Sequence, residues 1–275
     1  MTRFTTSADG TEVAYSVTGA GPALILVDGA MCHRMFGPST ELASVLDKNF
    51  TVYTYDRRGR GETGDGVTPW SLEREVEDID AIVKEAGGSA FVFGVSSGAV
   101  LAMEAATRLP GIARLALYEA PFVVDDTYPA RPADIAQQMD RFIADGNPGG
   151  AVTAFMKMVG VPGFGIVMMK LMPPWKKLKQ VAPTLPNDLR ILGDDGRGSK
   201  LPANRWNVKV PTLAMDGGKS PQYLRNAMKN VAEVLGPDTE YKTLPGQTHM
   251  YKPSLMAVEL VEFFSRAQRT AGPIA

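Results

Sequence analysis

Ser96 stands at the centre of a Gly-x-Ser-x-Gly pattern between two predicted elements of different kinds. The apolar run Ala90–Phe93 before it predicts a buried strand, and the small-residue stretch Ser97–Arg108 after it predicts a helix. A tight strand-to-helix turn strains the serine backbone and exposes the hydroxyl at the helix N-terminus, where the N–H of Ser97 can stabilise a developing oxyanion. We therefore predict that Ser96 is a nucleophile and that Ser97 contributes to an oxyanion hole.

A serine nucleophile needs a base, and the 275-residue chain contains only two histidines, His33 and His249. Together with one cysteine, Cys32, these side chains are too few for a zinc site, so we expect no metal. A single cysteine cannot form an internal disulfide, which favours a reducing, cytoplasmic environment.

Composition excludes several broad classes of protein. Hydrophobic residues make up 44% and charged residues 21% of the chain, as in a globular protein and unlike an intrinsically disordered one. Lysine and arginine number 29 against 30 acidic residues, so no field that would hold a nucleic acid is expected. The polar N-terminus predicts no signal peptide, and the most apolar stretch, 151–172, is too interrupted to be a transmembrane segment.

Strands and helices alternate through most of the chain. Further strands are expected at Glu12–Val17, Ala23–Val27, Thr51–Tyr55, Leu115–Tyr118, Thr212–Met215 and near Thr239–Thr243, and further helices at Leu72–Glu85, Pro221–Leu235 and Ser254–Arg269. This alternation predicts an α/β fold with a mostly parallel sheet covered on both faces, and a ligand site at the C-terminal ends of the strands. The tail 270–275 is expected to be frayed.

Residues 122–205 interrupt the alternation, because they are rich in methionine, proline and glycine and contain no convincing strand. We interpret them as a helical cap inserted after the sixth strand, with the core formed by 1–121 and 206–275. Met156 and Phe164 are candidate pocket residues in the cap, since methionine and aromatic side chains suit an apolar entrance. Burial of the cap helices against the core explains the same side chains equally well.

Three more segments make the chain resemble the α/β-hydrolase superfamily. Val27–Ala30 looks like the loop that completes the oxyanion hole, Tyr55–Thr63 like the family's Asp-x-Arg-Gly-x-Gly-x-Ser loop, and Leu244–His249 follows the last predicted strand, where the family keeps its catalytic histidine. The resemblance covers nearly the whole chain outside 122–205 and implies the α/β-hydrolase fold. The arginines of Tyr55–Thr63 are expected to be structural and to form surface pairs.

The resemblance also implies roles for single residues. His249 takes the place of the catalytic base, and the backbone N–H of Ala30 that of the second oxyanion donor. Asp28 replaces the usual histidine of the oxyanion loop, and an acid at this place is expected to alter the electrostatics of the site. Asp28, Met31 and His33 are therefore further candidate pocket residues.

A serine and a histidine of this kind act with a third residue, an acid, and at this acid the sequence departs from the family pattern. After the seventh strand, Ser220 stands where the family has an aspartate. Our candidate is Glu119 at the end of the sixth strand, because haloalkane dehalogenases, which resemble this arrangement, carry their acid there. Asp216, four residues before Ser220, is the alternative acid, and a structural role for Glu119 also stays open.

Together these features predict a capped serine hydrolase that needs no cofactor. Its substrate would be a small to medium, largely apolar ester, thioester or lactone, cleaved through an acyl-enzyme. The scaffold also accommodates a biosynthetic lyase, cyclase or acyltransferase, a C–C hydrolase, or a non-catalytic small-molecule receptor. A homodimer is compatible with the sequence.

Overall fold

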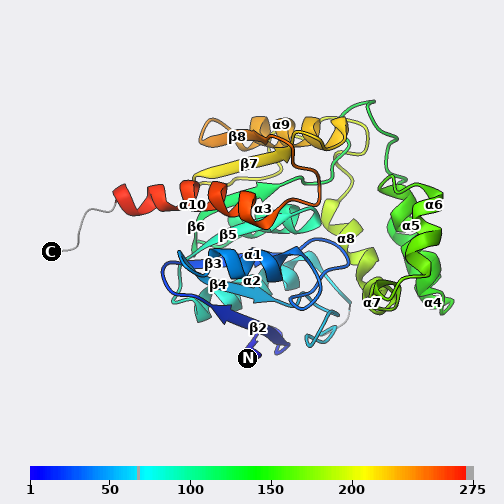
Figure 1. Cartoon of the computed structure of the whole chain (residues 1–275), viewed down its shortest axis with the longest axis horizontal. Helices are drawn as coiled ribbons and strands as arrows, with labels where there is room; N and C mark the ends of the chain where they lie inside the picture. The colour runs from blue at the N-terminus through cyan, green and yellow to red at the C-terminus, as the bar shows by residue number, and fades with distance from the viewer. Residues whose placement is uncertain (67–68, 271–275) are drawn as a thin grey trace.

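A sheet of eight strands forms the centre of the described chain, which comprises residues 1–66 and 69–270 of a computed structural model (Figure 1). Its order is β1-β2-β4-β3-β5-β6-β7-β8, with β2 antiparallel to both of its neighbours and all other pairs parallel. The strands are β1 (Arg3–Thr6), β2 (Glu12–Thr18), β3 (Ala23–Val27), β4 (Thr51–Tyr55), β5 (Ala90–Val95), β6 (Ile112–Tyr118), β7 (Thr212–Gly217) and β8 (Thr239–Leu244). The tail 271–275, expected to be frayed, lies outside the described residues.

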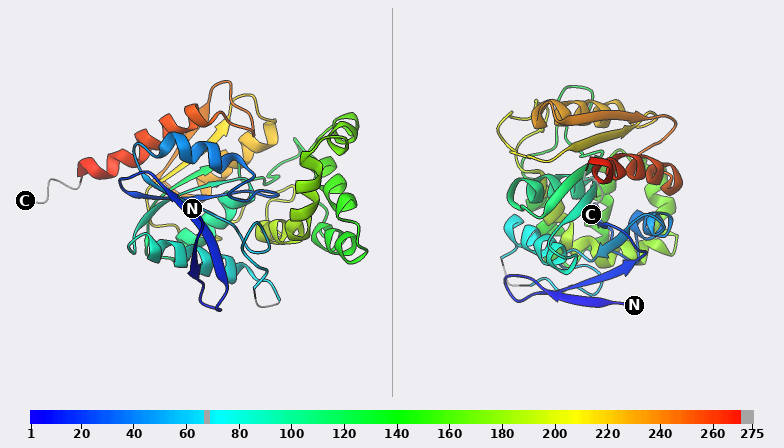
Figure 2. Two further views of the ribbon diagram at one scale, coloured as in Figure 1. Left: turned by 60° about the horizontal axis from the view of Figure 1, so that its bottom comes forward. Right: turned by 90° about the vertical axis from the view of Figure 1, so that its left-hand side faces the viewer.

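Helices cover both faces of the sheet (Figure 2). One face carries α1 (Pro38–Leu46) and α10 (Pro253–Thr270), and the other carries α2 (Leu72–Glu85), α3 (Ser97–Arg108) and α9 (Gln222–Leu235). Successive side chains of a strand point to opposite faces, so a strand buried on both sides is apolar throughout. In β5, Phe91 stacks on Phe264 of α10 at 4.9 Å, while Val92 packs among the residues of the opposite face.

The predicted α/β-hydrolase fold is confirmed, and the predicted strands and helices of the core lie within a few residues of the observed ones. Two elements were missed. Strand β1 has only four residues, which are mostly exposed, so it lacks the apolar run that marks a buried strand. Helix α1 follows Gly37 and begins at Pro38, a good first helical residue, but its nine residues are too few for a clear periodic pattern.

Between β6 and β7 the chain is helical. Its elements are α4 (Ile135–Ala144), α5 (Pro148–Met158), α6 (Gly163–Lys170), α7 (Pro174–Val181), a 3-10 turn (Ala182–Thr184) and α8 (Leu185–Leu192). We call residues 122–205 the helical segment; it stands at one end of the sheet, green to yellow-green in Figure 1. The stretches that enter and leave it lie side by side, because Val123 N donates to Gly196 O and Gly198 N donates to Val123 O. No described helix is long and apolar enough to cross a membrane.

Candidate active site

Ser96 occupies the turn between β5 and α3. Its φ of 57° and ψ of −130° lie in a region that non-glycine residues rarely adopt, so the residue is strained. The strain is held by neighbouring backbone, since Ser96 N donates to Tyr118 O at 2.9 Å and Ala99 N donates to Ser96 O at 2.9 Å. Gly98 permits the close packing of this turn, because a Cβ there would lie 2.3 Å from Val27 O.

The loop after β3 comes close to the serine hydroxyl. A Cβ on Gly29 would lie 2.8 Å from Ser96 Cβ and 3.4 Å from Ser96 Oγ, so only glycine fits at this point. Ala30 follows Gly29 directly, and Ser97 is the first residue of α3, where a backbone N–H has no acceptor within its own helix. The two residues predicted to hold an oxyanion therefore border the place where the loop meets Ser96.

Buried Glu119 and partly exposed His249 are joined by a short hydrogen bond. Glu119 Oε2 lies 2.7 Å from His249 Nδ1, and Glu119 Oε1 accepts from Gly217 N at 2.7 Å. Glu119 is fully buried and has a φ of 48°, a second strained residue at a strand end. An ionised Glu119 accepts this hydrogen bond from an Nδ1–H of His249, and in that tautomer Nε2 is free to accept another.

The loop that carries His249 is fastened to the ends of β6 and β7. Tyr118 OH donates to Thr248 O at 2.7 Å, and Lys219 N donates to Gln247 O at 2.8 Å. Within the described chain no hydrogen bond joins Ser96 Oγ to His249, whose side chain is 39% exposed. Catalytic hydrogen bonds of this type are commonly long without substrate and shorten when it binds.

Asp216, the alternative acid, is equally buried but has different partners. Its Oδ2 accepts a hydrogen bond from Tyr241 OH of β8, and its Oδ1 is buried without a partner in the described chain. Burial raises the pKa of Asp216 above the usual range of an aspartate. Ser220, at the usual position of the family's acid, is also buried, and its hydroxyl makes no hydrogen bond to a described residue.

The loop after β4 corrects one prediction from the sequence. Its arginines are not surface residues: Arg57, Arg58 and Arg60 are each at most 2% exposed. Arg60 Nη1 donates to Gly29 O at 2.7 Å, and Arg57 Nη1 donates to Asp28 O at 3.3 Å. The guanidinium groups therefore support the backbone of the loop that faces Ser96, which surface pairs could not do.

A buried acid of the helical segment completes this arginine cluster. Asp188 of α8 accepts from Arg57 Nη1 at 2.8 Å, from Arg60 Nη2 at 2.6 Å and from Ser97 Oγ at 2.8 Å. Burial opposes its ionisation, but Arg60 and Arg57 hold the pKa of Asp188 below its usual value. Sequence reasoning missed Asp188, and the only available signal was a single unassigned acid among the mostly apolar residues of α8.

The predicted pocket residues of the core have mixed surroundings. Asp28 is buried, accepts from Ser39 Oγ at 2.6 Å, and has its pKa raised by burial to about 6. Met31 is buried with a φ of 63°. His33 packs against Phe36 and is partly exposed, and burial lowers its pKa. None of these three contacts Glu119 or His249 through a hydrogen bond between described side chains.

The predicted pocket residues of the helical segment differ from each other. Met156 of α5 is half-buried and packs against the main core. Phe164 of α6 is 78% exposed, so its ring lies on the surface, and its role as a pocket residue stays a prediction. The inward side chain of α6 is Ile166, and residues two apart on a helix point to opposite sides, so Phe164 points outward.

Most of the chain is similar to known alpha/beta hydrolases. A family model described as the alpha/beta hydrolase family matches residues 19–262. The chain belongs to the alpha/beta hydrolase family. A solved alpha/beta hydrolase from Sphaerobacter thermophilus is 43% identical, with a TM-score of 0.87 over 95% of this chain and 100% of that chain. An esterase from a Rhodococcus species, 20% identical with a TM-score of 0.68 over 96% of this chain and 98% of that one, shares the fold.

Curated relatives match a shorter part of the chain than these solved structures do. A hydrolase of uncharacterised function from Bacillus subtilis is 32% identical over 113 residues, which cover 38% of this chain and 40% of the relative. A pimeloyl-acyl-carrier-protein methyl ester esterase from Xylella fastidiosa is 36% identical over 105 residues, or 38% of each protein. The match therefore spans two fifths or less of the length of these relatives.

Proposed function

We propose that this member of the family is a serine hydrolase of the esterase type that works through an acyl-enzyme. The observation that carries the proposal is the 2.7 Å contact between Glu119 Oε2 and His249 Nδ1, with a serine held at a φ of 57° at the end of the neighbouring strand. An oriented imidazole beside a strained, accessible serine is the arrangement that activates a hydroxyl for attack on a carbonyl. Serine as nucleophile suits acyl transfer rather than dehalogenation.

The reaction would proceed in two halves. His249 Nε2 accepts the proton of Ser96 Oγ as the oxygen attacks the acyl carbon, and the N–H groups of Ala30 and Ser97 stabilise the resulting oxyanion. The imidazolium then protonates the leaving group, and the acyl chain stays on Ser96 as an ester. A water molecule, deprotonated by the same nitrogen, cleaves this ester and restores the enzyme. Glu119 stabilises the charged imidazole in both halves.

The choice of Glu119 as acid over Asp216 rests on their hydrogen bonds. Both oxygens of Glu119 are used, one by Gly217 N and one by His249, so the carboxylate is held in one orientation. Asp216 binds Tyr241 instead and makes no hydrogen bond to His249 within the described chain. We infer that the family's acid has moved from the end of β7 to the end of β6.

The helical segment would act as a cap and select the substrate. Asp188 fixes α8 against Ser97, which places the segment at the end of the sheet that carries the proposed triad. Half-buried apolar side chains of the segment, such as Phe155, Met156 and Met158, favour a small to medium, largely apolar ester, thioester or lactone. The name of the Xylella relative supports an ester as the bond cleaved.

Labelling with a small fluorophosphonate tests the proposal without knowledge of the substrate. The probe phosphonylates an activated serine and releases fluoride, so the intact mass of the protein increases by one adduct. We expect one adduct on the wild type and none on Ser96→Ala. Ser44→Ala is the matched control, because it removes an exposed serine hydroxyl of α1 far from this turn in the chain, and it should still be labelled.

An unlabelled, folded wild type would contradict the acyl-enzyme mechanism. A lyase, cyclase or acyltransferase that uses His249 or Asp28 for proton transfer would then keep its activity in Ser96→Ala. A receptor would bind a hydrophobic ligand in a fixed ratio and leave it unchanged. A cytoplasmic location and a homodimer stay predictions, the first supported by the single cysteine, Cys32.

A further inference from the structure

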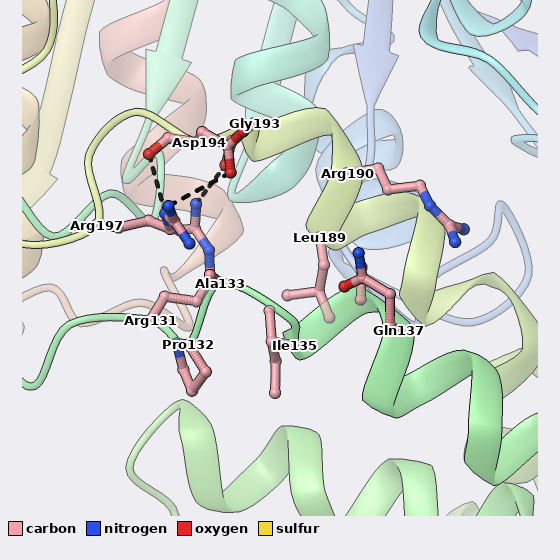
Figure 3. Close-up of a pocket in the computed structure, with 11 residues that line it drawn as sticks. Arg131, Pro132, Ala133, Ile135, Gln137, Leu189, Arg190, Gly193, Asp194 and Arg197 are labelled. Atoms are coloured by element: carbon pink, nitrogen blue, oxygen red, sulfur yellow. Dashed lines mark hydrogen bonds and ion pairs between the residues drawn. The ribbon is translucent and has the colours of Figure 1, made fainter.

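A cavity with polar lining lies in the helical segment, and none of its lining residues belongs to the proposed triad (Figure 3). A cavity of about 190 Å³ is formed by 131–137, which lead from β6 into α4, and by 189–197, which lead from α8 towards β7. No residue of the turn at Ser96, of the oxyanion loop Val27–Ala30 or of the loop that carries His249 lines this cavity. Its volume is well beyond that needed for one water molecule, so it has room for a small ligand.

Arg131 is the residue that distinguishes this cavity. It is only 7% exposed, and its Nη2 donates to Gly193 O at 2.9 Å, while its Nη1 is buried without a hydrogen-bond partner in the described chain. Figure 3 shows its side chain directed to the part of the cavity bordered by Gly193, Asp194 and Arg197. A buried donor without an acceptor is costly, and more so when it is charged.

The other buried arginines of the described chain show what Arg131 lacks. Arg34, Arg57, Arg58 and Arg60 each pair with a buried carboxylate at 2.6 to 3.0 Å. Arg131 alone among these buried arginines forms no ion pair with a described residue. Burial and the nearby charges of Arg197 and Arg205 lower its pKa to about 10, so the surroundings are short of negative charge.

Two more features of the cavity favour an anion. Arg197, whose side chain is 26% exposed, lines the same cavity, and its nearest carboxylate, Asp194, lies 3.5 Å away and is itself 90% exposed, so this pair is weak. The cavity also includes the first turn of α4, a ten-residue helix without a side-chain cap. Asp134, at the cap position, accepts from Gln138 Nε2 instead. Uncapped N–H groups at a helix N-terminus attract anions.

We propose that this cavity binds a small oxyanion, a phosphate or carboxylate group, held by Arg131 Nη1, Arg197 and the first turn of α4. The planar guanidinium of Arg131 suits the paired oxygens of either group. Because the lining residues come from the stretches that enter and leave the helical segment, the bound anion would connect the two. The site would thereby stabilise the segment independently of chemistry at Ser96.

Isothermal titration calorimetry of the full chain tests this site, with sodium phosphate and sodium malonate as probes and sodium chloride at equal ionic strength as the reference. We expect saturable binding of one anion per chain for phosphate, malonate or both, and the better probe identifies the preferred group. Arg131→Gln should weaken binding by about tenfold or more, since it removes a charged donor. The matched control Arg74→Gln, a partly exposed arginine of α2 paired with Glu77, should bind within about twofold of wild type.

Asp194→Asn separates ligand binding from a purely structural role of Arg131. Removing this negative charge beside Arg197 should tighten anion binding by about twofold to fivefold, because it reduces repulsion and releases Arg197. If Arg131→Gln does not fold, as judged by circular dichroism, Arg197→Gln and Asp194→Asn decide the question, with weaker and tighter binding expected respectively. Binding of neither anion above the chloride reference, or equal binding by wild type and folded Arg131→Gln, would overturn the proposal.

Discussion

The ends of β6 and β7 each present a fully buried acid, yet the two acids have different surroundings. Glu119, after β6, contacts His249 and Gly217 and adopts a φ of 48°. Asp216, within the end of β7, binds Tyr241 of the next strand and keeps one oxygen unpartnered within the described chain. Burial alone therefore does not identify a catalytic acid, and the partner of each carboxylate carries the distinction.

Backbone strain also differs between the ends of β6 and β7. The positive φ values of non-glycine residues in the described chain occur at Met31, Ser96 and Glu119. These residues follow β3, β5 and β6, which are adjacent in the sheet, while the end of β7 is regular. Strain of this kind persists where surrounding contacts hold it and is concentrated at functional sites. It places the proposed acid, the nucleophile and the oxyanion loop on three neighbouring strand ends.

The largest effect is expected from removing His249, the partner of Glu119, and not from removing Tyr241, the partner of Asp216. His249→Ala should lower kcat/KM for an activated ester by about 10⁴-fold or more, because it removes the base. Tyr241→Phe, which removes the partner of Asp216, should leave kcat/KM within about twofold of wild type. Steady-state assays of the two folded variants check this, and a comparable loss in Tyr241→Phe would point to Asp216 as part of the catalytic machinery.

Asp188 extends the contrast to a buried acid with a structural role. Asp188→Asn should lower the free energy of unfolding by about 3–5 kcal/mol, because Arg57 and Arg60 would lose their shared carboxylate inside the protein. Chemical denaturation measures this loss. Asp80→Asn, which breaks an exposed pair with Lys84, is the control and should cost less than about 1 kcal/mol. Equal, small effects in both variants would show that the arginine cluster does not anchor the helical segment.

Asp28 should affect stability less than Asp188 does, and its effect should depend on pH. Burial raises its pKa from 3.8 to about 6, so ionisation is harder in the folded protein than in the unfolded chain. The free energy of unfolding should therefore fall as pH rises from about 4 to about 6, by up to about 3 kcal/mol from this group. Asp28→Asn, which keeps an acceptor for Ser39, should be more stable than wild type at about pH 7 and equal to it near pH 4.

Denaturation curves of wild type and Asp28→Asn at these two pH values check the sign as well as the size. Subtracting the free energy of unfolding of one protein from that of the other cancels the contributions of the titrating groups that both share. A stability difference that does not change with pH would contradict a raised pKa at Asp28. A wild type that gains stability relative to the variant as pH rises would reverse the expected sign.

Local patterns account for what the sequence could predict. The elbow at Ser96 and the core strands follow from glycine spacing and short apolar runs, both of which depend on residues close together in the chain. Glu119 was placed by family resemblance, and the structure adds its 2.7 Å contact with His249 across 130 positions. Its catalytic role stays a prediction until the two acids are compared directly.

Long-range pairing accounts for what the sequence could not predict. Arg57 and Asp188 are 131 positions apart, and no local pattern indicates that two such charges meet in the interior. The arginines therefore looked like surface residues. The position of Phe164 could not be predicted either, because α6 is apolar around most of its circumference and its sequence does not show which side packs inward. Only the tertiary structure distinguishes Ile166, which is buried, from Phe164, which is not.

The most direct test of the central claim compares the two acids by their effect on the nucleophile. The second-order rate of fluorophosphonate labelling of Ser96 is measured by intact mass for wild type, Glu119→Gln and Asp216→Asn. Glu119→Gln should be labelled about 10²- to 10⁴-fold more slowly, because the imidazole loses the carboxylate that sets its tautomer and stabilises its charge. Asp216→Asn should react within about threefold of the wild-type rate. Labelling of Glu119→Gln at the wild-type rate, or a large loss confined to Asp216→Asn, would contradict the assignment of Glu119 as the catalytic acid.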